Sequence, residues 1–210
     1  MSAASGAERA GRWRQRRDLV TVILLSLTAV LTAWCGFQAS KWSGEMSISF
    51  SQASSARVQA ADAASQARDA RQWDLTLWVQ WVLADGRNDQ TLRDYVEKRF
   101  SPELRTAFEQ WQANGKTDNG PFATKAYSPE GAGRAEELNH RADVRFARAL
   151  ETNQLSDNYT LLTVLFALVL FLTALSQRDL KDWGRTALLT TALVGAAAGI
   201  VLLAIFPINI

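Results

Sequence analysis

Residues that build catalytic and metal centres are scarce in this chain. Its 210 residues include a single cysteine, Cys35, and a single histidine, His140. One cysteine excludes an intramolecular disulfide, and we interpret Cys35 as a small buried apolar residue and His140 as a solvated side chain. The patterns HExxH, GxSxG, paired cysteines and a phosphate-binding glycine loop do not occur. We therefore expect no catalytic residue, no metal site and no cofactor, and a protein that is not an enzyme.

Charge is missing from three segments, which comprise residues 19–37, 160–176 and 186–206. Each is close to the roughly 20 apolar residues that a helix needs to cross a bilayer. The first segment could also be a signal peptide, but no small-residue cleavage site ends it, so we prefer an uncleaved anchor. Because the segments contain no charged side chain, they do not favour an ion-coupled transporter, although a pore formed by oligomerisation stays open. The sequence predicts three transmembrane helices.

Basic residues indicate the orientation of these spans. Arginines concentrate in the tail 1–18 and basic residues recur in the loop 177–185, and such clusters favour the cytoplasmic side. Residues 38–159 are then extracytoplasmic, with the N-terminus in the cytoplasm and the C-terminus outside. The outer membrane interface is expected to hold three aromatic residues, Trp34, Trp42 and Tyr159. We expect membrane lipids as partners of the chain, with the basic tail able to touch lipid head groups, and no nucleic acid.

Glycine and proline are absent between Gly44 and Gly86. This favours one helix that continues out of the first span to Ala84, where the sequence Ala-Asp-Gly is a stop signal. Ser128 as N-cap and Pro129 in the first turn predict a shorter return helix that runs into the second span. We therefore expect an antiparallel coiled-coil stalk, residues 38–72 and 129–159, and a small helical cap, residues 73–128.

Alanines recur on the outgoing helix in alternating steps of three and four, at Ala53, Ala56, Ala60, Ala63, Ala67 and Ala70. Alanine at both core positions of a heptad lets two helix backbones approach closely. The return helix carries residues at matching spacing, Ala135, Leu138 and Ala142. We favour an intramolecular antiparallel pair, which places Ala60 opposite Leu138 and, in the same register, Ala53 near Arg145. Packing of the stripe against a neighbouring subunit is the alternative.

Aromatic residues are concentrated in the cap, and we assign six of them to its core or to an interface: Trp73, Trp78, Trp81, Phe100, Phe108 and Trp111. Helical spacing over residues 89–113 is interrupted by Ser-Pro-Glu-Leu at 101–104, which predicts two short helices. Residues 114–127 contain two glycines and a proline and are expected to form a loop. No segment shows the signals of a strand, so we predict an all-α fold.

The third span contains Gly195 and Gly199 in the pattern small-xxx-small. This pattern permits close contact between helices in lipid. The contact can be made with the first or second span of the same chain, or with a second copy.

Two stretches, AWCGFQASKWSGEMS after the first span and SDNYTLLTVLFALVLFLTALS at the second, resemble a family of uncharacterised bacterial membrane proteins. Members of that family have an N-terminal anchor, a long helical extracytoplasmic domain and two C-terminal spans. The resemblance implies a bacterial plasma (inner) membrane and no particular activity. We interpret the protein as one that acts by interaction, either as a homo-oligomeric scaffold or as an accessory subunit of another membrane protein. The alternative is a periplasmic signal sensor that acts through a cytoplasmic partner.

Overall fold

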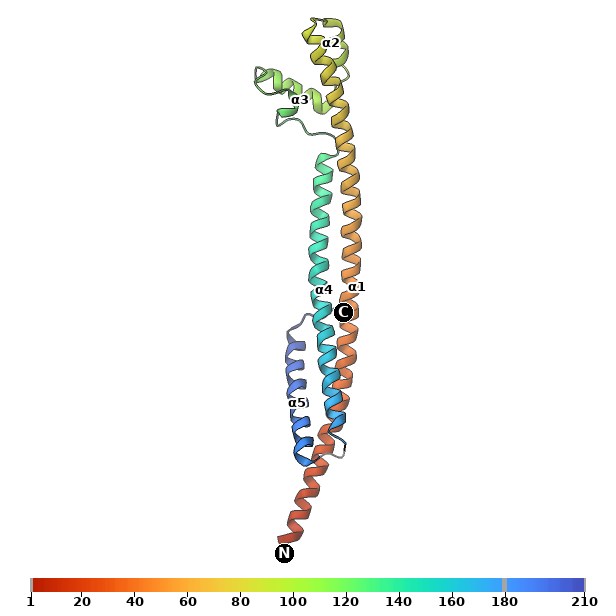
Figure 1. The fold of residues 1–210 in the computed structure, drawn as a ribbon, viewed down its shortest axis with the longest axis vertical. Coiled ribbons are helices and arrows are strands. Elements are labelled where there is room, and N and C mark those ends of the chain that lie inside the picture. Colours follow the sequence, from red (N-terminus) through yellow and green to blue (C-terminus); the bar gives the residue numbers. More distant parts are fainter. Residues whose placement is uncertain (1, 179–180, 210) are drawn as a thin grey trace. The chain divides into compact units, whose positions relative to one another are not determined.

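A computed structural model describes the backbone of residues 2–178 and 181–209 and the side chains of residues 18–178 and 181–209. Within these ranges the protein contains five α-helices, one short 3-10 helix and no strand (Figure 1). The predicted all-α class is therefore confirmed. The side chains of the basic tail before Asp18, on which the orientation of the spans depends in part, lie outside the described residues.

The elements follow in the order α1, Ser2–Gly86; α2, Gln90–Glu97; α3, Pro102–Ala113; the 3-10 helix η1, Pro121–Ala123; α4, Ala132–Leu175; and α5, Asp182–Ile205. In the described part of the chain, α1, α4 and α5 are the helices long and apolar enough to cross a membrane. Only 22%, 28% and 17% of their most apolar windows are buried inside the protein. Most of this apolar surface faces outward, which a lipid environment accommodates and water does not.

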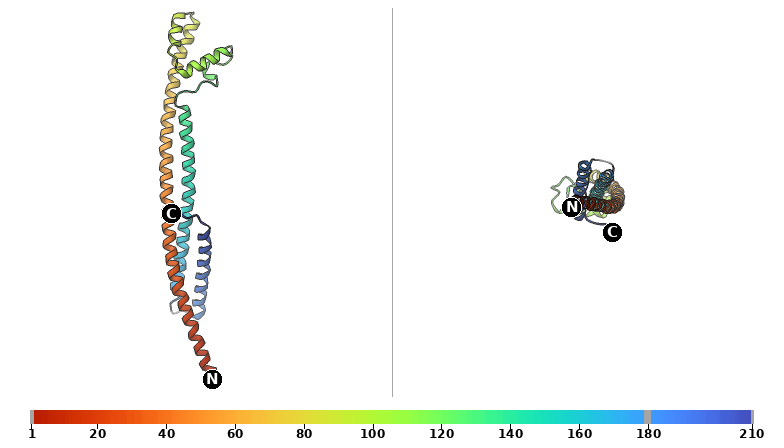
Figure 2. Two further views of the ribbon diagram at one scale, coloured as in Figure 1. Left: turned by 180° about the vertical axis from the view of Figure 1, so that it is seen from behind. Right: turned by 90° about the horizontal axis from the view of Figure 1, so that it is seen from below.

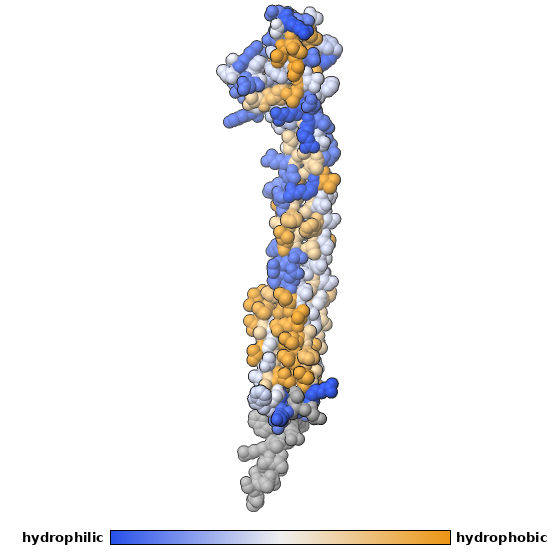
Figure 3. Space-filling view, viewed as in Figure 1, coloured by the Kyte–Doolittle hydropathy of each residue, from blue (hydrophilic) through white to orange (hydrophobic). Residues whose placement is uncertain are grey.

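The chain divides into two compact units. Unit 1 comprises Met1–Ser49 and Arg148–Ile210, and unit 2 comprises Phe50–Ala147. In unit 1, α5 lies along α4 in each view (Figures 1 and 2). Apolar residues cover much of the visible face of α5 and of the helices beside it (Figure 3). Unit 2 contains the adjoining parts of α1 and α4 together with α2, α3 and η1.

Local signals explain how α1 ends and how the short helices begin. The last residue of α1 is Gly86, as the predicted stop signal requires. Asp89 then caps α2 by accepting a hydrogen bond from the backbone N–H of Leu92 at 3.0 Å. Ser101 caps α3 through the N–H of Leu104, also at 3.0 Å. The predicted division of residues 89–113 into two helices is confirmed.

The start of α4 differs from the sequence prediction. The sequence favours a start at Ser128 and Pro129, whereas the helix begins at Ala132. Gly131 has a φ of +87°, outside the helical region, and the N–H of Ala132 bonds to the Pro129 carbonyl at 3.1 Å to close a turn. A Cβ on Gly131 would lie 2.9 Å from the Ala63 carbonyl oxygen. The chain therefore turns close against α1 before its return helix can start.

Two aromatic residues that the sequence assigns to the outer interface are buried inside unit 1. Tyr159 is fully buried, and its hydroxyl donates to the Pro207 carbonyl at 3.0 Å. Trp42 is buried in the same cluster. The cover for Tyr159 comes from the segment after α5, where the ring centroid of Phe206 lies 5.8 Å from that of Tyr159. The sequence pattern does not reveal that this segment folds back over Tyr159.

Candidate functional site

The alanine stripe of α1 is buried within unit 2, with exposed fractions of 8% or less for Ala53, Ala56, Ala60, Ala63 and Ala67. Ala70 is half-buried. The cover comes from α4, where Ala142 is also buried. Ala60 and Ala63 form one cluster with Ala135 and Leu138. Ala60 and Leu138 therefore meet as the antiparallel register predicts, and the stripe is covered within one chain.

Polar and aromatic residues beside the stripe pair the two helices. Arg57 of α1 donates hydrogen bonds to Asp143 and Asn139 of α4. Phe50 and Phe146 pack with their ring centroids 5.4 Å apart. Because both partners of the Arg57 ion pair are exposed, it contributes at most about 1 kcal/mol. Its main effect is to fix which residues face each other.

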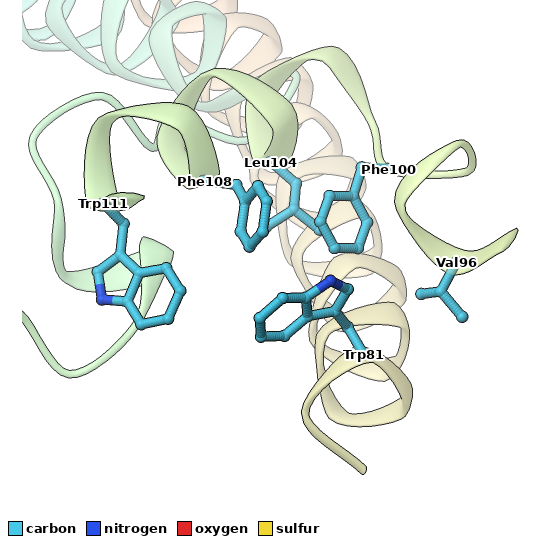
Figure 4. Close-up of a cluster of buried hydrophobic side chains, with 6 residues drawn as sticks. All are labelled: Trp81, Val96, Phe100, Leu104, Phe108 and Trp111. Carbon is cyan, nitrogen blue, oxygen red and sulfur yellow. The ribbon is translucent and has the colours of Figure 1, made fainter. Parts of the chain in front are cut away.

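The cap has an aromatic core that joins α1 to α2 and α3. Six buried residues form it: Trp81, Val96, Phe100, Leu104, Phe108 and Trp111 (Figure 4). Trp78 is half-buried and stacks on Trp81 with ring centroids 5.1 Å apart. The indole N–H of Trp81 donates to Glu97 at 2.6 Å, and that of Trp111 donates to the Asp118 carbonyl at 2.8 Å. The cap thus buries large rings without leaving these two donors unpaired.

Trp73 lies outside this core and is 66% exposed. Adjacent positions on a helix are roughly 100° apart, so Trp73 points away from the face that carries Asp74 and Trp81. Its assignment to the cap core is therefore corrected, while a role at an interface stays a prediction.

Asp74 connects three parts of unit 2, and sequence reasoning missed it. The side chain is 2% exposed, and Oδ2 accepts hydrogen bonds from the Ser101 hydroxyl at 2.9 Å and the Tyr127 hydroxyl at 3.1 Å. Its Oδ1 is buried and has no hydrogen-bond partner among the described protein atoms. One carboxylate of α1 thereby holds the N-cap residue of α3 and the loop before α4. Its position, seven residues after Ala67, continues the core repeat and is the signal that could have found it.

Tyr127 responds electrostatically to this arrangement. Burial raises the pKa of its hydroxyl above the ordinary value, and the negative charge of Asp74 and the hydrogen bond to it raise the pKa further. The hydroxyl therefore stays protonated and continues to donate at neutral pH.

Gly195 and Gly199 are in contact with α4 of the same chain. A Cβ added to Gly199 would lie 2.7 Å from the Phe166 ring, and one added to Gly195 would lie 3.1 Å from the Val169 side chain. Both glycines therefore allow α5 to approach α4 closely. Of the alternatives that the sequence leaves open, the structure places these two residues against the second span.

A polar latch in unit 1 joins α1 to the segment after α5. Gln38 is fully buried, donates to the Asn209 carbonyl at 3.0 Å and accepts from the Asn209 N–H at 2.9 Å. The Asn209 side chain donates to Glu45 at 3.0 Å, and Glu45 also accepts from Arg148 at 3.0 Å. Every polar group named here has a partner, so the latch is a structural feature and offers no free group for chemistry.

The single histidine and cysteine lie apart from these contacts. His140 is exposed on α4, and Cys35 is fully buried in unit 1. Across residues 18–178 and 181–209, no three His, Cys, Asp or Glu side chains are grouped so as to hold a metal ion.

Exposed apolar side chains remain as the candidate functional surface of unit 2. They include Trp73, Val79, Val82 and Leu83 on α1 and Tyr95 on α2. Apolar colouring is visible over this end of α1, whereas polar residues occupy much of the surface nearby (Figure 3). Large apolar patches of this kind mark interaction sites more often than they occur by chance. No family model, curated protein or solved structure matches the chain.

Proposed function

We propose that this protein is a multi-pass membrane protein that acts by non-enzymatic interaction, as a self-associating scaffold or as an accessory subunit of another membrane protein. The observation that carries this proposal is the exposed apolar surface of unit 2. The rest of unit 2 is rich in charged residues, so this part of the chain is suited to water. Exposed tryptophan, valine and leucine side chains in such a setting are typical of a surface that binds another protein.

The apolar helices support the membrane location. The segments 19–37, 160–176 and 186–206 contain no Asp, Glu, Lys, Arg or His. Threonine hydroxyls in these segments bond back to carbonyls of the preceding turn, as Thr32 does to Thr28 at 2.7 Å and Thr173 to Val169 at 2.7 Å. The hydroxyls of Thr32 and Thr173 thus need no water, whereas the buried Thr28 hydroxyl has no hydrogen-bond partner among the described atoms. These features favour spans that anchor the protein over spans that conduct ions.

The orientation is proposed from the basic residues on either side of the spans. The arginine-rich tail and the loop 177–185 favour the cytoplasm, which leaves unit 2 extracytoplasmic. The family resemblance supports a bacterial plasma membrane. A reporter enzyme that is active only outside the cytoplasm should work when fused after Lys116 and fail after Asp182. The reverse result would overturn the orientation.

Self-association is tested on the full chain in lipid. The protein is purified in a mild detergent, reconstituted into nanodiscs of a size that admits several copies, and weighed by native mass spectrometry. We expect particles with two or more copies, or with one copy and a stoichiometric membrane partner. A chain that is monomeric and without a partner at all protein-to-lipid ratios would refute the proposal.

A sensor is the second candidate function, and one feature of the cap favours it. An open crevice of about 390 Å³ lies between α2 and α3, with Phe100 and Phe108 among its lining residues. Charged residues of both signs surround these rings, including Lys98, Arg105 and Glu109. A small polar ligand bound there would contact both short helices. Hydrogen exchange of the cap with and without a library of small solutes tests this candidate, since a bound ligand slows exchange in α2 and α3.

A further inference from the structure

The exposed apolar residues on the cap end of α1 form a continuous stripe. Leu75, Val79, Val82 and Leu83 follow one another in steps of one, three and four residues, so they share one face of the helix. Val79, Val82 and Leu83 are 51%, 45% and 46% exposed, and Leu75 is half-buried. We refer to these four residues as the α1 stripe.

Three of the four residues of the α1 stripe, Val79, Val82 and Leu83, are left exposed by the described chain. Gly131, which precedes α4, lies against Ala63 and Ala67. The return helix α4 therefore starts beside these residues and runs along α1 in the direction away from Leu75. The short helices α2 and α3 pack on another face of α1, where Trp81 is buried and Trp78 is half-buried. The stripe is thus the face of α1 that remains after both partners within the chain have been placed.

The absence of charge around the stripe distinguishes it from the rest of α1. Asp74 is the one charged residue in positions 72–84, and it is buried. Residues 57–71, by contrast, include Arg57, Asp62, Arg68, Asp69 and Arg71. A solvated helix face normally carries charges, and their absence here suits a surface that is covered by protein.

We propose that the α1 stripe pairs with the α1 stripe of a second copy, with the two helices parallel. This inference rests on the proposed self-association and names its surface. Copies inserted with one topology send α1 out of the membrane on the same side, so each residue of the stripe meets its own counterpart. Such a two-fold arrangement places identical residues of the two copies beside each other. Identical charged residues would repel each other there, whereas uncharged residues do not.

Because the α1 stripe is small, it can hold a second copy only when both chains lie in the same membrane. Four side chains per copy bury far less than the roughly 1,200 Å² of a stable interface between soluble proteins. Chains confined to one membrane meet at a high effective concentration, so a small contact is enough to hold them together. We therefore expect association that depends on the protein-to-lipid ratio and weakens when the lipid is increased.

Cysteine cross-linking tests the pairing directly. In a Cys35→Ala background, Val79→Cys and Gln80→Cys are made separately in the full chain and oxidised in native membranes. Residue 80 is also exposed to solvent but lies roughly 100° around the helix from residue 79. We expect disulfide-linked dimers several-fold more abundant for Val79→Cys, because a disulfide needs two Cβ atoms about 4 Å apart. Equal or absent cross-linking at the two positions would overturn the proposed surface.

A charge introduced into the stripe gives a second measurement that does not depend on a disulfide. Val79→Glu places two like charges face to face, and Gln80→Glu adds the same charge beside the stripe. We expect Val79→Glu alone to lower the dimer fraction in nanodiscs, with unchanged helical circular dichroism in both variants. If the wild type self-associates and neither variant lowers the dimer fraction, the α1 stripe is not the surface that pairs, and the proposed self-association itself still holds. A monomeric wild-type protein, or a cross-linked species that contains a different protein, would overturn the second copy as occupant.

Discussion

The two parts of unit 2 are packed on opposite principles. Along the alanine stripe, α1 meets α4 mainly through alanine side chains. Just before α4, one carbon added to Gly131 would lie 2.9 Å from the Ala63 carbonyl oxygen. In the cap, Trp81, Phe108 and Trp111 fill the space between elements that are shorter and less regular. Small residues therefore bring backbones together, and large residues bridge elements that cannot approach.

The energetic consequence follows from the area that each part buries. An alanine buries little apolar surface per residue, whereas a tryptophan or phenylalanine buries about 150–250 Å². The alanine stripe is long and gains its stability from many small contacts, while the cap gains its stability from a few large ones. Single substitutions should thus act mainly by removal of volume in the cap and by addition of volume at the stripe.

The largest effect is expected in the cap from Trp81→Ala. This removes a buried ring that stacks on Trp78 and touches Phe108. We expect a loss of about 3–5 kcal/mol in the opening free energy of α2 and α3, measured by hydrogen exchange with mass spectrometry on the full chain. Trp73→Ala is the matched control, because Trp73 is exposed. Equal effects of the two changes would contradict the assigned core.

The next largest loss of stability is expected at the alanine stripe from Ala60→Leu. Three added carbons must enter a contact that Ala63, Ala135 and Leu138 already fill. Overpacking should cost about 1–3 kcal/mol and accelerate exchange in both α1 and α4. The control is Ala61→Leu, which adds the same volume to an exposed neighbouring position. If Ala60→Leu exchanges like the control, the helices are not packed through this face.

Gly131→Ala tests the close approach of the chain to α1 just before α4. The new Cβ would meet a backbone oxygen that cannot rotate away, and alanine is strained at a φ of +87°. The left-handed backbone alone costs about 1–3 kcal/mol, which should appear as faster exchange in the first turns of α4. Gly133→Ala provides the comparison, since nothing lies within 4 Å of its added Cβ. We expect that variant to be as stable as the wild type or slightly more stable.

The smallest effect is expected from Tyr127→Phe, which removes one hydrogen bond from the buried Asp74 carboxylate. We expect a loss of about 0.5–1.5 kcal/mol at neutral pH, because Oδ2 keeps the Ser101 donor and is not left without a partner.

The pH dependence of this loss follows from the raised pKa of Tyr127. The neutral hydroxyl is favoured in the folded protein, so its contribution is complete below the unfolded pKa of about 10 and is lost as pH rises from there through the folded pKa. The stability difference between wild type and Tyr127→Phe should therefore be constant near neutral pH and shrink in alkaline solution. Cap tryptophan fluorescence measured against pH tests this, and a difference that shrinks between pH 5 and 8 would contradict it.

The parts of this fold that sequence predicts are those specified by neighbouring residues. The alternating steps from Ala53 to Ala67 establish the stripe and its register, and serine followed by proline establishes the break before α3, because both signals act over a few residues. The heptad count also reaches Asp74. Its partners, Ser101 and Tyr127, lie 27 and 53 residues away, and no local pattern connects them.

Burial inside unit 1 was harder to predict for the same reason. Composition marks which segments are apolar, but it does not say which face of each helix meets lipid. Tyr159 has an amphipathic side chain that suits a membrane interface, and only the return of Phe206 and Pro207 over it places it inside.

The latch between Gln38 and Asn209 also has a consequence for the order in which the protein is made. A buried amide without partners is costly, and the backbone that satisfies Gln38 lies 171 residues further along the chain. Ribosomes must therefore synthesise all of unit 2 before unit 1 can be finished. Until then, the amide of the first apolar helix depends on water or lipid head groups for its hydrogen bonds. Assembly of the membrane part is thereby tied to the completion of synthesis at least as far as residue 209.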